Sequence, residues 1–481
     1  MAAPTIESLR DVVRGQVVEP NDPSYDEARS IYNAMHDRRP RVVVRCVDEA
    51  DVIAALAVAR ANQLALSVRG GGHSVAGFGT CDDGLVIDLS PMRWVRVDPD
   101  KRTARAGGGA LWGDFDHATH PYGLSTTGGI ISTTGVCGLA LGGGIGYLAR
   151  KHGLSCDNIL SADVITADGR RVTASHHQNE DLFWALRGGG GNFGVVTSLE
   201  LQLHPVGTVF GGPMFFELHA AGEVMRRFDE LIADAPEELG AFFAFQIAPP
   251  LPFIPEHRHG DTLCLIVACW SGHLGEGEKV VGAMRDLGPV VAENVRPLPY
   301  RTLNSAFDGL LPKGLQHYWK ADFVRTLTDG AIAAHVEHGS RMPCVESTMH
   351  LYPLGGAVRR VGRSETAFSH RDVGFAAIIA GMWPDAADNE ANTAWVREYY
   401  AAIHPHSGVD GGYVNFMAGD DADRVKDNYG ANYERLARVK AQWDPDNVFR
   451  MNQNVRPAAK VLGEVQPKAS RADTVSPRIG G

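Results

Sequence analysis

Long apolar runs and an excess of basic residues are both missing from this sequence. Nowhere in its 481 residues does an uninterrupted apolar run approach the about 18 residues that cross a bilayer, so no membrane span is expected. Residues 1–15 carry Glu7, Arg10 and Asp11 and no apolar core, which argues against a secretory signal. The net charge of −11 argues against nucleic acid as a partner. These absences predict a cytoplasmic protein with neither a membrane nor a nucleic-acid partner.

Cysteine is scarce, and its spacing excludes the usual structural uses. The seven cysteines are scattered, their number is odd and no CxxC pair occurs, so reduced thiols are expected rather than a disulfide framework. The histidines also lack convincing metal-ligand spacing. We therefore predict no metal site and interpret the following group as surface residues: His257, His259, His335 and His338.

Glycine, in contrast, is abundant and clustered. A chain of this length should divide into two or three domains. Its 55 glycines concentrate at 70–72, 107–109, 142–146 and 188–194, between apolar runs. Clusters in that position indicate a backbone wrapped closely around a ligand rather than a flexible linker.

The first of these clusters follows a short apolar run at 64–68, which predicts a buried strand. The chain then reads Arg69, three glycines, His73 and Ser74. Backbone N–H groups left bare by glycines form a concave anion site that suits a diphosphate. His73 would lie at its rim, where it could be hydrogen-bonded, metallated or alkylated. Taken alone, it could equally be a loop histidine that caps a turn.

A second glycine-rich wall runs from 135 to 146, followed by an Asp157–Asn158 step and by Trp184-Ala-Leu-Arg-Gly-Gly-Gly-Gly-Asn-Phe-Gly at 184–194. A competing motif lies within it, because residues 144–149 satisfy GxGxxA with Asp168 about twenty residues on, as in a nicotinamide fingerprint. We discount that alternative because Asp168 falls on a predicted hairpin turn and no clear βαβ unit surrounds the glycines.

Residues 209–408 change character, with strand and helix patterns in alternation. Such a pattern fits a sheet covered by helices on one face. The predicted strands are 209–217, 241–247, 263–270, 321–326, 347–352 and 375–382, and the predicted helices include 219–235, 275–287 and 388–403. Residues 460–481 are polar and rich in Pro and Gly, so we predict a disordered tail there.

The loop with His73, the second glycine-rich wall, the Asp157–Asn158 step and the segment 184–194 follow one another in this order. In this they resemble the FAD-linked oxidases of the vanillyl-alcohol oxidase, PCMH-type superfamily, in its berberine-bridge-enzyme-like branch. The resemblance covers about residues 35–457 and is strongest at 64–200 and 410–455. It implies an α+β fold. An FAD-binding domain at 1–208 would be completed by a C-terminal segment at 409–459, around a substrate domain at 209–408 with an antiparallel sheet covered by helices.

The resemblance also implies the cofactor and its ligands. His73 would be joined to the flavin 8α-methyl and Cys137 to C6, giving bicovalent FAD; Cys137 alone would read as a buried small hydrophobe. The other implied cofactor-binding residues are Arg69, Gly70, Gly71, Gly72, Ser74, Gly77, Gly128, Gly138, Gly142, Gly143, Gly144, Gly146, Asp157, Asn158, Val196, Asn415, Asn452 and Asn454.

Three residues are candidates for catalysis. In the family, a tyrosine of a Tyr-x-Asn-Tyr element acts as general base; here the element is Tyr413-Val-Asn-Phe416, so the second tyrosine is replaced. His350 and Tyr352 share one face of a predicted strand. Plant relatives have a carboxylate base just beyond, where this chain has Arg359 and Arg360, which gives Tyr413 more weight. The alternatives are a tyrosine and a histidine that serve only packing.

The resulting expectation is an FAD-dependent oxidoreductase that passes a hydride from a hydroxyl substrate, alcohol or carbohydrate-like, to flavin N5. Molecular oxygen or another acceptor would reoxidise the flavin. A natural-product enzyme that closes a ring or desaturates its substrate is the alternative, and a non-catalytic flavin-binding protein is a remote one. The substrate itself is not specified, because the resemblance is weakest in the domain that would select it.

Overall fold

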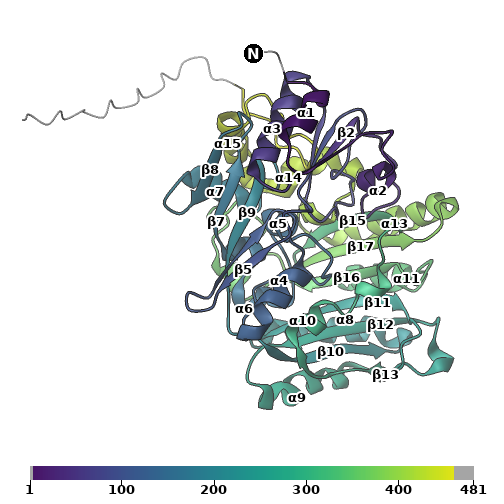
Figure 1. The fold of residues 1–481 in the computed structure, drawn as a ribbon. Coiled ribbons are helices and arrows are strands. Elements are labelled where there is room, and N and C mark those ends of the chain that lie inside the picture. Colours follow the sequence, from purple (N-terminus) through teal and green to yellow (C-terminus); the bar gives the residue numbers. More distant parts are fainter. Residues whose placement is uncertain (1–3, 460–481) are drawn as a thin grey trace, which may run out of the picture.

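The computed structural model describes residues 4–459, in which three sheets follow one another along the chain (Figure 1). The tail predicted at 460–481 lies outside the described residues. Within 4–459 no helix combines the length and the apolarity needed to span a bilayer.

The first sheet has the order β1-β2-β4-β3, with β2, β4 and β3 parallel to one another. Its strands are buried apolar runs, as expected of parallel strands. Asp48 caps helix α3 by accepting a hydrogen bond from the Asp51 N–H. The bounds are α1 Ile6–Val12, β1 Gln16–Val18, α2 Tyr25–Arg29, β2 Val42–Arg45, α3 Glu49–Ala61, β3 Leu66–Arg69 and β4 Leu85–Asp88. The loop at 69–76 that carries His73, which we call the histidine loop, therefore begins at the carboxyl end of β3.

The second sheet is antiparallel, with the order β5-β6-β9-β7-β8. Asp168 lies on the turn between β7 and β8, which pair as a hairpin, so the glycines at 142–146 belong to no βαβ unit and the nicotinamide fingerprint does not apply. The bounds are β5 Val95–Asp98, β6 Thr103–Gly107, α4 Trp112–Thr119, α5 Val136–Leu141, α6 Ala149–His152, β7 Ile159–Ile165, β8 Arg171–Ser175, α7 Glu180–Leu186 and β9 Val195–Gln202.

The third sheet has eight antiparallel strands in the order β13-β10-β12-β11-β16-β17-β15, with β14 paired to β10. Figure 1 shows helices α8, α11 and α13 along it. The strand bounds are β10 Thr208–Phe216, β11 Leu239–Ile247, β12 Thr262–Trp270, β13 Val290–Glu293, β14 Arg296–Pro299, β15 Gln316–Val324, β16 Thr348–Pro353 and β17 Phe375–Trp383. The helix bounds are α8 Ala221–Asp234, α9 Leu274–Gly282, α10 Tyr300–Asn304, α11 Asp329–Gly339, α12 Ala357–Arg360 and α13 Asn389–Ile403.

This sheet separates two hydrophobic cores, because neighbouring residues of a strand face opposite sides. Leu351 and Ile379 pack with helix residues such as Val396 and Phe228 in one core. Tyr352 and Ile378, one position along, belong to the core shared with the second sheet. The expected antiparallel sheet covered by helices is confirmed, and it leaves its second face free to build a site.

The chain returns to the first half of the molecule through α14 (Val425–Tyr429) and α15 (Tyr433–Trp443). The fully buried Lys440 Nζ lies 2.7 Å from Asp444 Oδ2 and donates hydrogen bonds to the carbonyls of Asn192 and Phe449. Asp444 also accepts from the Phe449 N–H. The element at 444–449, which reads Asp-Pro-Asp-Asn-Val-Phe, is thus held against the glycine segment at 188–194.

Candidate functional site

A cavity of about 330 Å³ lies where four parts of the chain meet. Its walls are the histidine loop at 69–76, the segment 129–145, the free face of β15, β16 and β17, and the segment 413–417. A second cavity of about 130 Å³ adjoins it. The two share Val68, Gly70, Gly138, Gly191 and Asn452, so together they outline one elongated site.

The glycines at the junction fit a long ligand that presses against the backbone. A Cβ added at Gly138 or at Gly191 would meet no protein atom within 4 Å, so both border open space. At Gly71 a Cβ would stand 2.4 Å from the Gly135 nitrogen, so this glycine lets the histidine loop and the second wall approach each other. Within the described part of the chain, Asn452 Oδ1 is buried without a hydrogen-bond partner, so it can accept a hydrogen bond from a ligand. The residues present therefore fit FAD.

His73 lines the larger cavity. Its ring stacks on Tyr32 with centroids 3.9 Å apart, and Thr134 Oγ1 lies 3.4 Å from His73 Nδ1. Burial lowers the pKa of His73 to about 4. The imidazole is therefore neutral at physiological pH, with a nitrogen lone pair available for bond formation.

Cys137 lies elsewhere in the elongated site. It stands in the first turn of α5, and its Sγ is 3.9 Å from the Gly107 carbonyl oxygen. It lines the smaller cavity together with Val196, whereas His73 lines only the larger one. Burial raises the pKa of its thiol to about 12, so the sulfur is protonated. The two predicted tethers therefore line different parts of the elongated site.

Several predicted cofactor glycines pack closely against other parts of the protein. Gly77 takes a φ of 74° and closes on the His36 ring, and Gly128 closes on Trp112. A Cβ at Gly142 would stand 2.1 Å from Asn415 Oδ1. Gly143, Gly144 and Gly146 are likewise packed against Phe368, Ser155 and the Gly128 carbonyl. The second glycine wall therefore allows the segment 413–416 to pack closely against it. Among the cofactor-binding residues predicted in this wall, only Gly138 borders both cavities.

Three predicted polar ligands line neither cavity. Asp157 forms a two-pronged ion pair with the buried Arg371, with both N–O distances at 2.7 Å. Asn158 Nδ2 donates to the carbonyls of His152 and Leu154. These two side chains hold the turn before β7. Asn454 is also absent from both cavity walls, although its Oδ1 is buried without a partner.

Arg69 does line the larger cavity, but its charge is already neutralised. The guanidinium lies 2.7 Å from Asp88 Oδ2 and donates to the Ala28 carbonyl at 2.6 Å. Gly70, Gly71, Gly72 and Ser74 remain in the same wall as predicted. The backbone, rather than the arginine side chain, is what this loop offers to a ligand.

Tyr413 lines the larger cavity, yet its hydroxyl is engaged. It accepts hydrogen bonds of 2.7 Å from the Gly144 N–H and from Asn415 Nδ2. Asn415 Nδ2 also donates to the Leu139 carbonyl at 3.0 Å. Burial raises the pKa of Tyr413. These contacts fasten the segment 413–416 to the second glycine wall.

His350 and Tyr352 stand side by side on β16 and both line the larger cavity. His350 Nδ1 lies 2.6 Å from the Tyr352 hydroxyl. Burial lowers the pKa of His350 to about 3 and raises that of Tyr352. The pair is therefore neutral across the physiological range and can exchange hydrogen bonds with a ligand.

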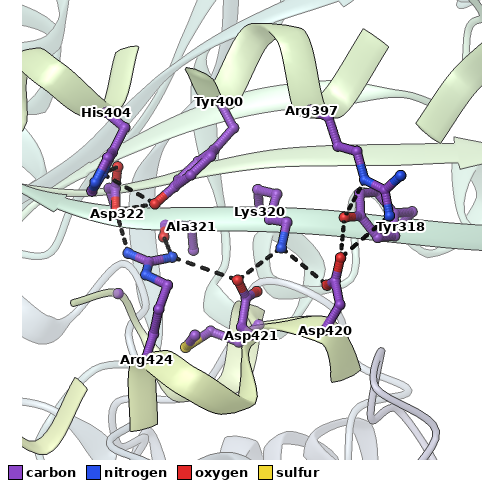
Figure 2. Close-up of polar contacts among 12 residues, drawn as sticks. Tyr318, Lys320, Ala321, Asp322, Arg397, Tyr400, His404, Asp420, Asp421 and Arg424 are labelled. Carbon is purple, nitrogen blue, oxygen red and sulfur yellow. Dashed lines mark hydrogen bonds and ion pairs between the residues drawn. The ribbon is translucent and has the colours of Figure 1, made fainter. Parts of the chain in front are cut away.

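A polar network on β15 anchors the other end of the segment that carries Tyr413 (Figure 2). Lys320 Nζ lies 3.0 Å from Asp420 Oδ1 and 2.7 Å from Asp421 Oδ1. Arg424 pairs with Asp322 at 2.6 Å. We call Lys320, Asp322, Asp420, Asp421 and Arg424 the β15 network. It fixes 420–424 to the strand that also carries the cavity residue Trp319.

Sequence reasoning missed much of the cavity wall. Tyr32 precedes all of the recognised motifs, and the apolar residues of β17 carry no chemical signature. Gly190 and Gly191 belong to a cluster that was noticed but not assigned. The missed residues that line the larger cavity include Tyr32, Ile130, Ile131, Thr134, Gly190, Gly191, Trp319, Ile378, Ala380, Met382, Phe416 and Gln453. Among residues 4–459, no group of three or more His, Cys, Asp or Glu could hold a metal ion.

Comparison with known families supports the same two halves of the site. A family model described as "FAD binding domain" matches residues 40–175, and one described as "Berberine and berberine like" matches residues 412–456. The first match contains the histidine loop and the second glycine wall. The second contains Tyr413, Asn415 and Asn452.

Individual relatives match over nearly the whole length. The FAD-linked oxidoreductase pgmH of Aspergillus terreus is 40% identical over 475 residues, covering 92% of this chain and 94% of that one. (R)-6-hydroxynicotine oxidase of Paenarthrobacter nicotinovorans is 31% identical over 470 residues, covering 92% and 97%. The crystal structure of 6-hydroxy-D-nicotine oxidase from Arthrobacter nicotinovorans superposes with a TM-score of 0.83 at 27% identity, covering 93% and 98%.

Proposed function

Because this chain belongs to the berberine-like FAD-linked oxidoreductases, we propose that it is an oxidase of a small hydroxyl- or amine-bearing molecule, with FAD bound along its two joined cavities. One observation carries this proposal. A neutral histidine on a glycine loop lines the same cavity as a hydrogen-bonded His350–Tyr352 pair from the opposite sheet. One wall can hold a flavin ring while the other holds the substrate.

The chain would hold the cofactor mainly through its backbone. The loop Gly70–Gly72, with Gly138 and Gly191, borders the passage between the cavities, and Asn452 offers an unpaired oxygen there. Val196 and Cys137 would border the far end in the smaller cavity. Bound FAD supplies a two-electron acceptor that oxygen or another oxidant restores.

For the covalent attachment we propose a tether through His73. Its neutral imidazole is the nucleophile that such a bond requires. The second predicted tether, Cys137, is weakly supported by the geometry, because its protonated thiol lies by the Gly107 carbonyl in the other cavity. A flavin ring beside His73 and a dinucleotide tail beside Cys137 would use both cavities.

For the substrate group that is oxidised, we propose that the His350–Tyr352 pair orients its O–H or N–H by a hydrogen bond. When Tyr352 donates to His350 Nδ1, its oxygen can accept a hydrogen bond from the substrate O–H or N–H. The substrate carbon would give a hydride to the two-electron acceptor that bound FAD supplies, its O–H or N–H would release a proton, and its C–O or C–N single bond would become a double bond. Tyr413, with two donors already on its oxygen, would position the segment instead.

The test is the intact mass of the purified protein and of three variants, His73→Ala, Cys137→Ala and the double variant. We expect the wild type and Cys137→Ala to carry one FAD through denaturation, and His73→Ala to release it. FAD that stays bound in His73→Ala but is lost from the double variant would instead establish the second tether. A purified protein with no flavin, covalent or not, would contradict the proposed function.

A further inference from the structure

The larger cavity offers a substrate very little charge. Among its lining residues, all of them in the described part of the chain, there is no lysine and no carboxylate. Its arginine, Arg69, is neutralised by Asp88. Because a buried charge without a partner is strongly unfavourable, an ionised substrate would gain nothing in this site to offset its lost hydration.

The wall that faces the histidine loop is largely apolar and aromatic. β17 contributes Ile378, Ala380 and Met382. The Phe416 ring lies 5.9 Å from that of Tyr352 and 6.3 Å from that of Trp319, so the three rings form one aromatic corner. Such rings pack well against a flat apolar or aromatic ligand.

Polar contacts on this wall are few. The Tyr352 hydroxyl is paired with His350 Nδ1, so toward a ligand this hydroxyl offers either its proton or one lone pair, according to the tautomer of His350. The Trp319 Nε1 is buried and has no partner among residues 4–459, so it can donate to one ligand oxygen. A sugar, with a hydroxyl on nearly every carbon, would have most of them buried without partners.

We propose that the substrate of this site is a neutral, mainly apolar aromatic molecule that presents one hydroxyl or N–H group to Tyr352. This inference rests on the proposed function and narrows it, because it excludes the carbohydrate-like substrates that the sequence left open. Recognition comes from the aromatic corner, and the His350–Tyr352 pair orients the one polar group.

Isothermal titration calorimetry of the FAD-loaded protein tests the proposal with small probes. Phenol is neutral and aromatic, and its hydroxyl-bearing carbon has no hydrogen to transfer, so its binding is measured without turnover. Benzoate, benzyltrimethylammonium and methyl β-cellobioside represent anions, cations and sugars. We expect phenol to bind at least tenfold more tightly than each of these three.

Two variants locate the contact. Tyr352→Phe should weaken phenol about fivefold, the effect of one lost hydrogen bond, and leave toluene unchanged. Tyr399→Phe is the matched control, because Tyr399 is also a buried tyrosine bonded to a histidine, His335 at 2.9 Å, but lies on α13 on the other side of the sheet. It should leave both probes unchanged.

Equal or tighter binding of benzoate, the quaternary ammonium or the glycoside would overturn the proposal, as would the absence of phenol binding. A Tyr352→Phe variant that loses phenol and toluene alike would also overturn it, because the hydroxyl would then not be the point of contact. These outcomes leave the proposed function standing, since FAD content and attachment are measured separately by mass.

Discussion

At the scale of the residue, tyrosine hydroxyls in this protein have different uses according to what already occupies them. The Tyr352 hydroxyl has one partner, the neutral His350, so its oxygen can still bond a ligand. The Tyr413 oxygen already accepts hydrogen bonds from two donors of the protein. Whether a tyrosine hydroxyl can bond a substrate therefore depends on which of its lone pairs the protein leaves unused, and a sequence motif does not show this. The same holds for Arg69, whose charge is consumed by Asp88.

Tyr413→Phe should accordingly lower stability. The buried Gly144 N–H would lose its acceptor, whereas Asn415 Nδ2 would keep the Leu139 carbonyl. An unpaired buried N–H costs about 1–3 kcal/mol, measurable as a lower urea midpoint with an unchanged slope.

Tyr147→Phe is the control for that measurement. Tyr147 is buried to a similar degree, but its hydroxyl has no partner within the described residues, so its removal should not lower the midpoint. Equal midpoints for wild type and Tyr413→Phe would contradict the positioning role, as would a loss that Tyr147→Phe reproduces.

At the scale of the element, the segment 413–424 is held at both ends. One end is fixed by Tyr413 and Asn415 to the second glycine wall, and the other by the β15 network to the substrate sheet. Because Phe416 and Met417 lie between these anchors and line the cavity, the position of Phe416 in the aromatic corner depends on contacts outside that corner.

Lys320→Met should loosen this segment. The side chain of Asp421 is only 4% exposed, and loss of its 2.7 Å partner leaves Arg424 at 3.7 Å as its remaining cation in the network. Breaking one partner of a buried pair costs about 3–5 kcal/mol. We expect faster amide hydrogen exchange at 413–425 and a lower melting temperature.

The exposed pair of Lys101 and Asp98 provides the control. Both side chains face water, with 77% and 41% exposure, so Lys101→Met should change the melting temperature little. If exchange at 413–425 stayed at the wild-type rate in Lys320→Met, the β15 network would not be the anchor of the segment.

At the scale of the whole molecule, the two halves meet in buried polar contacts as well as in the shared core. Asp116 of α4 is almost fully buried and accepts a hydrogen bond of 2.8 Å from Asn304 Nδ2 of α10. Burial raises the pKa of Asp116 to about 7. This carboxyl is therefore protonated in the folded protein at mildly acidic pH.

The consequence is a pH-dependent loss of stability with a definite sign. Between about pH 4 and pH 7 the unfolded chain releases this proton and the folded chain keeps it, so stability falls as pH rises through that window and levels off above it. Asp116→Asn should remove this contribution.

The measurement is the melting temperature of wild type and Asp116→Asn from pH 4.5 to pH 8. The melting temperature of Asp116→Asn minus that of the wild type should increase as pH rises, by a few degrees over the whole range. A difference that stays constant across the range would contradict a raised pKa for Asp116.

The local sequence determined the longer strands and helices and the glycine loop at 70–72. A short apolar run followed by glycines has few possible conformations, so the strand before the loop 70–72 was predicted correctly. In the structure the glycines of that loop and Val196 of β9 line the two joined cavities. Short edge strands such as β13 and β14 were missed, because their pairing with β10 comes from the sheet and not from their own pattern.

Only the tertiary structure decided which residues face the cavity. Cys137 and Gly138 are neighbours, yet only Gly138 borders the cavity of His73, because successive residues of a helix point in different directions. Asp157 could not be excluded as a ligand from sequence, since its partner Arg371 lies more than two hundred residues away. The sequence alone specified a flavin-type loop with His73. Packing between distant segments gave the Tyr413 hydroxyl two donors from the protein and left the His350–Tyr352 pair in the cavity wall.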